Sequence, residues 1–300
     1  MFIHFVMRKI LFLTLLLSLQ YSCNDGDIIV TDFNFEASNL NTCGGPGAYI
    51  FYNVNNSSAA ESISFVLETN NILFLESSIE EYILNGTTNI VNYRKYDNDI
   101  DDDYFCSIIP PTTPNVTIEY IGASGVAVLT TITTKDDEDG IEEDFTSDLD
   151  TDNDGLLDYY DYDDDGDNVP TVNELGPDFL EGITENPLDT DNDGVFDYLD
   201  TDDDNDGVLT RYEDANGDLD PTNDFTNPNE GPDFLNTNVT NSNIIDLYRI
   251  HTYRLKSDLE LVINNLVLVN GSEEITKESM LLGNQSSVID GQVSVTPEFN

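Results

Sequence analysis

Aspartates recur at alternate positions in the middle of the chain, a spacing that can bind a hard divalent cation. The stretch 202–213, DDDNDGVLTRYE, offers oxygens at positions 1, 3, 5, 7, 9 and 12 of a twelve-residue loop. A Ca²⁺ loop uses these six positions and needs a residue that tolerates a left-handed backbone at position 6. Here the predicted ligands of loop 4 (residues 202–213) are Asp202, Asp204, Asp206, the Val208 carbonyl, Thr210 and Glu213.

Three further loops repeat this spacing. Loop 2 (residues 163–174) has Asn168 in place of glycine at position 6, a substitution that the left-handed tolerance of Asn permits. Its predicted ligands are Asp163, Asp165, Asp167, the Val169 carbonyl, Thr171 and Glu174. Loop 1 (residues 150–161) has Asp150, Asp152, Asp154, the Leu156 carbonyl, Asp158 and Asp161, and loop 3 (residues 189–200) has Asp189, Asp191, Asp193, the Val195 carbonyl, Asp197 and Asp200.

Loops 1 and 3 end on aspartate rather than glutamate at position 12. The shorter side chain makes a bidentate contact harder, so we expect these two loops to bind Ca²⁺ more weakly or to discriminate less against Mg²⁺. Residues 149–174 align without a gap on residues 188–213, which indicates one structural unit used twice. Only one residue separates the two loops of each copy, so no amphipathic helix fits between them and the module must be poor in helix.

The charge of the chain agrees with cations as its partners. It has 60 acidic and 10 basic side chains, for a formal net charge of -50, and this balance excludes nucleic acid as a partner. More than half of the acidic side chains lie between residues 136 and 235, where Arg211 is the only basic residue. Clustered carboxylates repel one another, so we expect about four or more Ca²⁺ ions to supply the folding energy of this segment.

Two weaker patterns lie beside the loops. Residues 135–144 place Asp137, Asp139 and Gly140 at positions 3, 5 and 6 of a degenerate loop, but Lys135 stands at position 1. Residues 214–224 offer a further set of oxygens. The alternative for the whole acidic stretch is a disordered linker, which the register of the repeated glycines argues against.

The spacing DxDxDGxxDxxD followed by DxDxDGVxxxxE resembles the thrombospondin type 3 repeat of extracellular calcium-binding proteins. The resemblance covers about residues 148–220, without the cysteines of the animal repeats, and is nearest to versions in lipoproteins of the Bacteroidetes. It implies a calcium-dependent rigid structure outside the cell, often in adhesion or surface-exposed proteins, and it does not imply catalysis.

The flanking segments must position this module, and they show the period-two alternation of half-buried strands. Strands are predicted near residues 49–51, 63–67, 116–120, 126–132, 248–252, 259–263, 267–269 and 293–295, with a short helix at 77–84. We expect a mainly β fold, an immunoglobulin-like antiparallel β-sandwich that is discontinuous: residues 24–134 and 244–300 form it, and residues 135–243 are the inserted acidic module. The alternative is a separate small C-terminal β-domain.

The first 23 residues predict an export signal, because Arg8 and Lys9 precede a short apolar run that ends before LQYSC. This resembles a lipobox with Cys23 as the lipidated residue, and an ordinary secretory signal is the alternative. In an oxidising compartment Cys43 and Cys106 are expected to form a disulfide, the alternative being two buried thiols.

Catalytic patterns are weak in this sequence. His251 is the single histidine after the signal, and an ordinary sheet histidine is the favoured interpretation. We therefore expect no enzyme, but a calcium-binding, lipid-anchored protein of the bacterial outer membrane or cell surface, with a structural, adhesion or interaction role and a protein or glycan partner. The alternative is a surface lipoprotein that captures glycans through tyrosine stacking.

Overall fold

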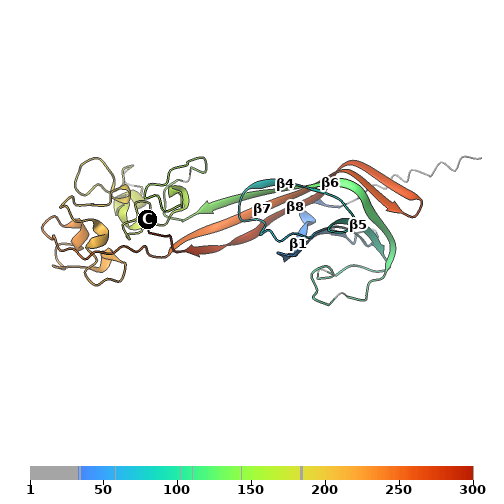
Figure 1. Cartoon of the computed structure of the whole chain (residues 1–300), viewed down its shortest axis with the longest axis horizontal. Helices are drawn as coiled ribbons and strands as arrows, with labels where there is room; N and C mark the ends of the chain where they lie inside the picture. The colour runs from blue at the N-terminus through green and yellow to red at the C-terminus, as the bar shows by residue number, and fades with distance from the viewer. Residues whose placement is uncertain are drawn as a thin grey trace, which may run out of the picture. The chain divides into compact units, whose positions relative to one another are not determined.

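The computed structural model describes residues 33, 35–57, 59–101, 103–109, 111–142, 144–182 and 185–299, so the export signal and Cys23 lie outside the described residues. The fold is mainly β, as predicted (Figure 1). Its strands are β1 (Asn41–Gly45), β2 (Ala48–Asn55), β3 (Glu61–Leu67), β4 (Ser78–Ile83), β5 (Asn89–Tyr96), β6 (Val116–Asp136), β7 (His251–Asn270) and β8 (Glu273–Val295). The short helices are η2 (Ala37–Asn39), η3 (Asp158–Tyr160), α2 (Thr171–Glu174), α3 (Pro177–Leu180), η4 (Asp197–Leu199), η5 (Thr210–Tyr212), η6 (Pro221–Asn223) and η7 (Asp233–Leu235).

One eight-stranded sheet contains all these strands. Its order is β1-β2-β3-β5-β6-β7-β8, and β4 pairs with β6 outside this path. The pairings from β1 to β6 are antiparallel, with Phe51 opposite Phe65 and Tyr93 opposite Tyr120. In this order β6, which ends at the start of the acidic stretch, lies beside β7, which follows that stretch.

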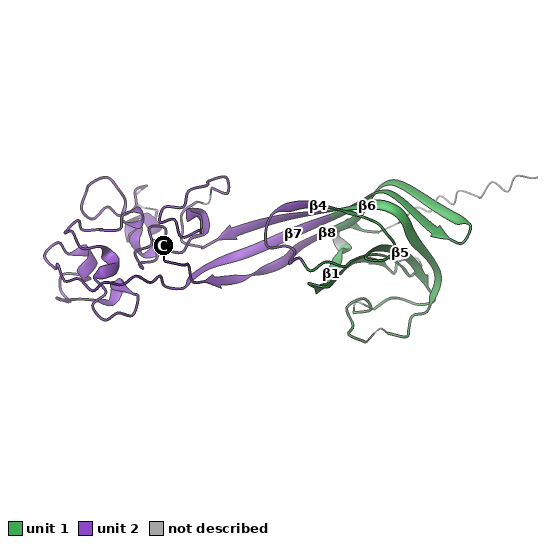
Figure 2. Ribbon diagram, viewed as in Figure 1, with its two compact units in different colours: residues 1–70, 81–128, 261–283 green, residues 71–80, 129–260, 284–300 purple. Residues whose placement is uncertain are grey.

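The chain divides into two compact units (Figure 2). Unit 1 comprises Met1–Asn70, Glu81–Val128 and Leu261–Gly283. Its interior is apolar and aromatic, because alternate residues of each strand point to the same face. Fully buried side chains include Phe51, Ile63, Phe65, Tyr93 and Leu261. Unit 2 comprises Asn71–Glu80, Leu129–Glu260 and Asn284–Asn300, and it contains the whole acidic module.

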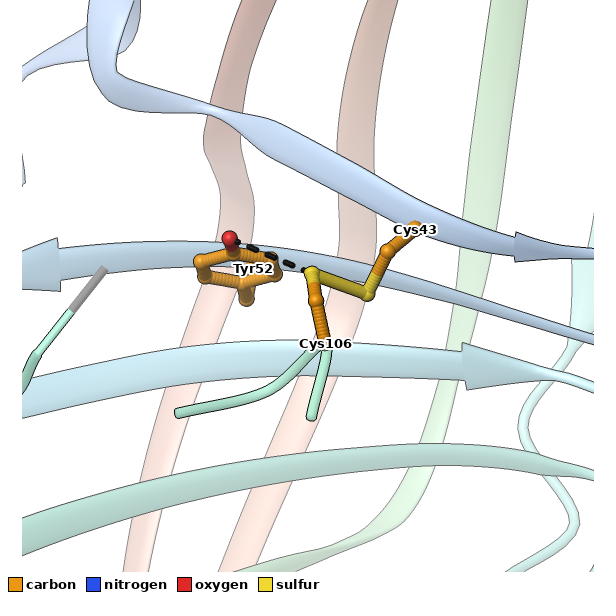
Figure 3. The surroundings of a disulfide bond; sticks show 3 residues. All are labelled: Cys43, Tyr52 and Cys106. Carbon is orange, nitrogen blue, oxygen red and sulfur yellow. Dashed lines mark hydrogen bonds between the residues drawn. A yellow bond between two sulfur atoms is a disulfide. The ribbon is translucent and has the colours of Figure 1, made fainter. Parts of the chain in front are cut away.

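A disulfide joins Cys43 of β1 to Cys106, with 5.7 Å between the Cα atoms, and this confirms the predicted pairing (Figure 3). The hydroxyl of Tyr52 donates a hydrogen bond to Sγ of Cys106 at 3.4 Å. The ring of Tyr52 also stacks on Phe105, with 4.6 Å between centroids. The bridge therefore holds the loop that carries Cys106 against the first two strands.

The structure corrects the helix predicted at residues 77–84, which forms strand β4 instead. Ile79 and Ile83 are β-branched, and pairing with β6 outweighs the helix propensity of the neighbouring glutamates. The strands predicted at 116–120 and 126–132 are one strand, because β6 continues through Gly125. Likewise the strands predicted at 259–263 and 267–269 are both parts of β7.

Strand β7 begins at His251, so residues 248–250 are not in the strand predicted for them. The backbone of this segment is bonded to the acidic module instead. Among the described residues, no helix is long and apolar enough to cross a membrane.

Candidate metal centres

The four predicted loops share one backbone closure. In each loop the N–H of position 9 donates to a carbonyl nine residues earlier, and a short helix begins at that point. These closures join Asp158 to Leu149 (3.0 Å), Thr171 to Tyr162 (3.1 Å), Asp197 to Leu188 (2.9 Å) and Thr210 to Thr201 (3.0 Å). The equal spacing of donor and acceptor explains why the loops can follow one another without long helices.

Position 6 of each loop has the left-handed backbone that the sequence predicted. Gly155, Gly194 and Gly207 have φ values of 100°, 100° and 93°, and Asn168 has a φ of 73°. Glycine has no Cβ to strain this conformation, and asparagine is the side chain that tolerates it best. The Asn-for-Gly exchange in loop 2 is therefore compatible with the common backbone.

The carboxylates at positions 3 and 5 shape each loop through one oxygen. The N–H of position 5 donates to Oδ1 of position 3, as from Asp154 to Asp152 at 2.9 Å, and the N–H of position 7 donates to Oδ1 of position 5, as from Val208 to Asp206 at 2.8 Å. The second oxygen of such a residue remains available. Oδ2 is buried without a hydrogen-bond partner in Asp154, Asp165 and Asp206.

Side chains at position 9 hold the loop together from within. Asp158 accepts hydrogen bonds from both N and Oγ1 of Thr151, and Asp197 accepts the same pair from Thr190. In loop 4 the Thr210 hydroxyl accepts the N–H of Asp203, and Thr171 does the same for Asp164 in loop 2. The side chain at position 9, which was predicted to bind the ion, therefore also stabilises the loop through its own hydrogen bonds.

The structure gathers most of the predicted carboxylate ligands into clusters whose oxygens lie within 4.8 Å of one another. Positions 1, 3 and 5 meet in loops 1, 3 and 4, whereas in loop 2 positions 3, 5 and 12 meet with Asp203. A further cluster contains Asp154, Asp161 and His251. These clusters include Asp150–Asp152–Asp154, Asp189–Asp191–Asp193, Asp202–Asp204–Asp206, Asp165–Asp167–Glu174–Asp203 and Asp154–Asp161–His251.

Asp163 is held by the backbone of its own loop. Its Oδ1 accepts the N–H groups of Gly166 at 3.1 Å and Asp167 at 3.2 Å, and its Oδ2 accepts that of Asn168 at 2.9 Å. These bonds fold the loop tightly around the first carboxylate. Asp163 is fully buried as a result.

Burial raises the pKa of the loop carboxyls, and neighbouring carboxylates add to this effect. The pKa of Asp203 is raised to about 11, that of Glu213 to about 9 and that of Asp152 to about 7. Burial also raises the pKa of the fully buried Glu174 well above its usual range. Without cations these groups therefore retain protons at pH values where a free carboxyl is ionised, and a bound cation would displace those protons.

His251 belongs to a candidate cluster but was not among the ligands predicted from the sequence. It is fully buried at the start of β7, and its Nδ1 lies 2.6 Å from Oδ1 of Asp161 and 3.7 Å from Oδ2 of Asp154. Burial lowers the pKa of His251, but the hydrogen bond and charge of Asp161, with the charges of Asp163 and Asp154, outweigh burial and raise it. Thus His251 fixes position 12 of loop 1 to the sheet, and no sequence spacing could indicate this contact.

Loop 2 departs from the repeat where residues 247–249 contact it. Asn168 donates from Nδ2 to the Leu247 carbonyl at 3.0 Å and accepts the N–H of Arg249 at 2.9 Å. The Arg249 guanidinium also donates to the Asn168 carbonyl at 2.8 Å. Glycine at position 6 of the other loops has no side chain to make these bonds.

Gly166 occupies position 4 of loop 2, where the other loops have asparagine. A Cβ at Gly166 would lie 2.8 Å from Cε1 of Tyr248 and 3.0 Å from Cβ of Asp152. The φ of 73° also favours glycine there. Asn168 and Gly166, which differ from the residues at the same positions of the other loops, therefore allow loop 2 to bind residues 247–249, the segment that leads into β7.

The weaker acidic patterns adopt related conformations. Glu138 and Gly140 have φ values of 64° and 103°, and Asp139 accepts the N–H of Ile141 at 2.7 Å, as position 5 does in the complete loops. A fifth loop, which was not predicted from the sequence, closes from the N–H of Asp233 to the Asp224 carbonyl at 2.9 Å. Its Thr226 donates to Asp233 as Thr151 donates to Asp158.

In residues 214–224, Asp214 accepts the N–H groups of Gly217, Asp218 and Leu219, at 2.6, 3.3 and 2.7 Å. This first carboxylate therefore folds its loop as Asp163 does.

Comparison of the chain with models of protein families, with curated proteins and with solved structures finds no match in any of the three.

Proposed function

We propose that this chain is a calcium-binding structural or interaction protein, in which several Ca²⁺ ions hold the acidic module folded. The observation that carries this proposal is the burial of carboxylate oxygens without hydrogen-bond partners inside the predicted loops. Both oxygens of Glu174 and both of Glu213, the two glutamates at position 12, are of this kind among the described residues. Buried polar atoms are paired in folded proteins, so atoms of this kind indicate a missing ligand.

The chemistry of these side chains favours a hard cation. The clusters offer carboxylate oxygens, with a backbone carbonyl and a hydroxyl available in each loop, and Ca²⁺ accepts six to eight such oxygens in a flexible geometry. Mg²⁺ demands a stricter octahedron and retains several waters, which suits clusters of several protein carboxylates less well. Thiolates are absent from the described clusters, and this argues against softer metals.

The remaining parts of the proposal follow from the sequence. The module is a repeat of the thrombospondin type 3 kind, inserted into an immunoglobulin-like β-sandwich between strands β6 and β7. The protein is exported, lipid-anchored through Cys23 at a bacterial outer membrane or cell surface, and non-catalytic. Its partner there is a protein or a glycan. Bound calcium makes the acidic module, residues 135–243, rigid at the cell surface.

Calorimetric titration of the chelator-treated mature chain with Ca²⁺ tests this function. We expect about four or more ions to bind, accompanied by an increase in ordered structure in circular dichroism. A parallel titration with Mg²⁺ should show weaker binding. A chain that binds no Ca²⁺ at millimolar concentration and is equally ordered without it would refute the proposal.

A further inference from the structure

Asp203 occupies position 2 of loop 4, where no ligand is predicted, yet its side chain is only 1% exposed. Both of its carboxylate oxygens are buried without a hydrogen-bond partner. An aspartate at this position would ordinarily be solvated, because burial of an unpaired charge is strongly unfavourable. The position of Asp203 therefore needs a reason outside its own loop.

The oxygens of Asp203 face loop 2, in the other copy of the repeat. One oxygen of Asp203 lies within 4.8 Å of one oxygen from each of Asp165, Asp167 and Glu174. All four side chains are at most 3% exposed. Both oxygens of Glu174 and Oδ2 of Asp165 also have no hydrogen-bond partner. Four buried carboxylates from two separate loops thus converge on one point.

The protein supplies little positive charge at this point. Among the described residues, no lysine, arginine or histidine forms an ion pair with any of the four carboxylates. Arg211 acts on Asp167 through its charge, but its guanidinium lies over the rings of Phe299 and Tyr212, at 4.8 and 5.3 Å. One such cation cannot balance four carboxylates, whereas a divalent ion in their midst would satisfy the unpartnered oxygens directly.

We propose that Asp165, Asp167, Glu174 and Asp203 together bind one Ca²⁺ ion that bridges the two copies of the repeat. This inference rests on the proposed function and adds to it a ligand from the second copy. The N–H of Asp203 is held by the Thr210 hydroxyl at 3.3 Å, so loop 4 must be folded for Asp203 to reach the ion. The bridging site therefore forms only when loops 2 and 4 are both folded.

Asp164 provides a matched control for Asp203. It occupies position 2 of loop 2, is 3% exposed, and its N–H is likewise bonded to the threonine at position 9. The carboxylates that act on it most are those of Asp158, Asp137, Asp161 and Asp139, none of which belongs to the bridging site. Asp164→Asn therefore changes the same chemistry at the same repeat position without touching the bridging site.

The direct test is to locate Ca²⁺ by anomalous scattering in crystals of the mature chain grown with calcium. We expect an ion between loops 2 and 4 with an oxygen of Asp203 at about 2.3–2.6 Å, the Ca²⁺ ligand distance. In Asp203→Asn this ion should be lost or its affinity reduced at least tenfold in calorimetry, while Asp164→Asn retains it. In the double variant of Asp203→Asn with Glu174→Gln, the loss should be smaller than the product of the two single losses, because both act on one ion.

Two outcomes separate this inference from the proposed function. If loop 2 binds Ca²⁺ without Asp203 as a ligand, or Asp203→Asn binds as the wild type does, the bridge is refuted and the calcium module stands. If no Ca²⁺ binds anywhere in the chain, both are refuted. The wild-type ion positions decide the question even where a variant fails to fold.

Discussion

The interior of unit 1 and the interior of the acidic module are equally inaccessible to water, yet they consist of opposite chemistry. Phe51 and Phe65 are fully buried in unit 1, and Asp163 and Asp167 are fully buried in the module. Removal of apolar area from water stabilises the first interior without any ligand. The second gathers like charges, so it needs cations or protons to persist. Burial alone therefore does not tell which regions fold by themselves.

Removal of calcium should have the largest effect, and it should unfold only one of the two regions. Chelation should unfold the module while unit 1 keeps its structure, because each of four sites saturated at 100 times its Kd contributes about 2.7 kcal/mol. A glutamyl endopeptidase should then cleave at Glu174 and Glu213 within the loops only in the chelated protein. Cleavage within unit 1 under the same conditions, or protection of both glutamates, would show that chelation does not selectively unfold the module.

Acidification should act on the metal-free module with a sign opposite to that of ordinary acid denaturation. Burial raises the pKa of Asp152 to about 7 and those of Asp154 and Asp204 to about 6. Below the ordinary carboxyl pKa both folded and unfolded states are protonated, so these groups impose no penalty. As pH rises toward 7 the unfolded chain ionises first, and the module loses stability.

Thermal unfolding of the chelated chain from pH 4.5 to pH 8 measures this effect. The module transition should move to lower temperature as pH rises, and saturating Ca²⁺ should abolish or reverse the trend. A module transition in the chelated chain that rises with pH across this window would show that the buried carboxyls are ionised without metal.

Substitution Phe65→Ala should destabilise unit 1 and leave the acidic module unaffected. Phe65 is fully buried in β3 and stacks with Phe51 at 5.8 Å between centroids. Truncation leaves a cavity and should lower the free energy of unfolding by about 3–5 kcal/mol. Denaturant titration with and without Ca²⁺ should give the same loss, since no carboxylate cluster is involved. A loss that disappears in calcium would show that the two interiors are not independent.

Substitution Asn168→Gly should have the smallest effect of these changes, and it should act on the module alone. Glycine tolerates the φ of 73°, so the variant removes the hydrogen bonds to Leu247 and Arg249 without straining the loop. The expected loss in the calcium-loaded protein is about 2 kcal/mol, at about 1 kcal/mol for each bond.

Asn153→Gly is the matched control, because it makes the same change at an exposed position with a φ of 63°. Its effect should stay within about 0.5 kcal/mol, as for other surface positions. Denaturant titration measures the loss of unfolding free energy in both variants. Equal losses would mean that the hydrogen bonds of Asn168 to Leu247 and Arg249 do not stabilise the protein.

Periodic patterns in the sequence were sufficient for the β content and the loop backbone, and the two cysteines after the export signal were sufficient for the disulfide. Both kinds of pattern are local, because strand alternation and loop spacing repeat within a few residues. The helix predicted at 77–84 failed where pairing with β6 decided the conformation of Ile79 and Ile83. The role of His251 was also missed, because its partner Asp161 is 90 residues away in the chain.

The order of Asp, Asn and Gly along the chain thus determined by itself where carboxylates can surround an ion, since each loop closes over nine residues through its own backbone. Tertiary structure alone decided which carboxylates of different loops lie together and which loop contacts the segment before β7. Asp203 reaches loop 2, and Asn168 and Gly166 receive residues 247–249, through contacts between segments that no spacing relates. Such contacts depend on how folded elements pack, and packing is set by shape and charge in three dimensions.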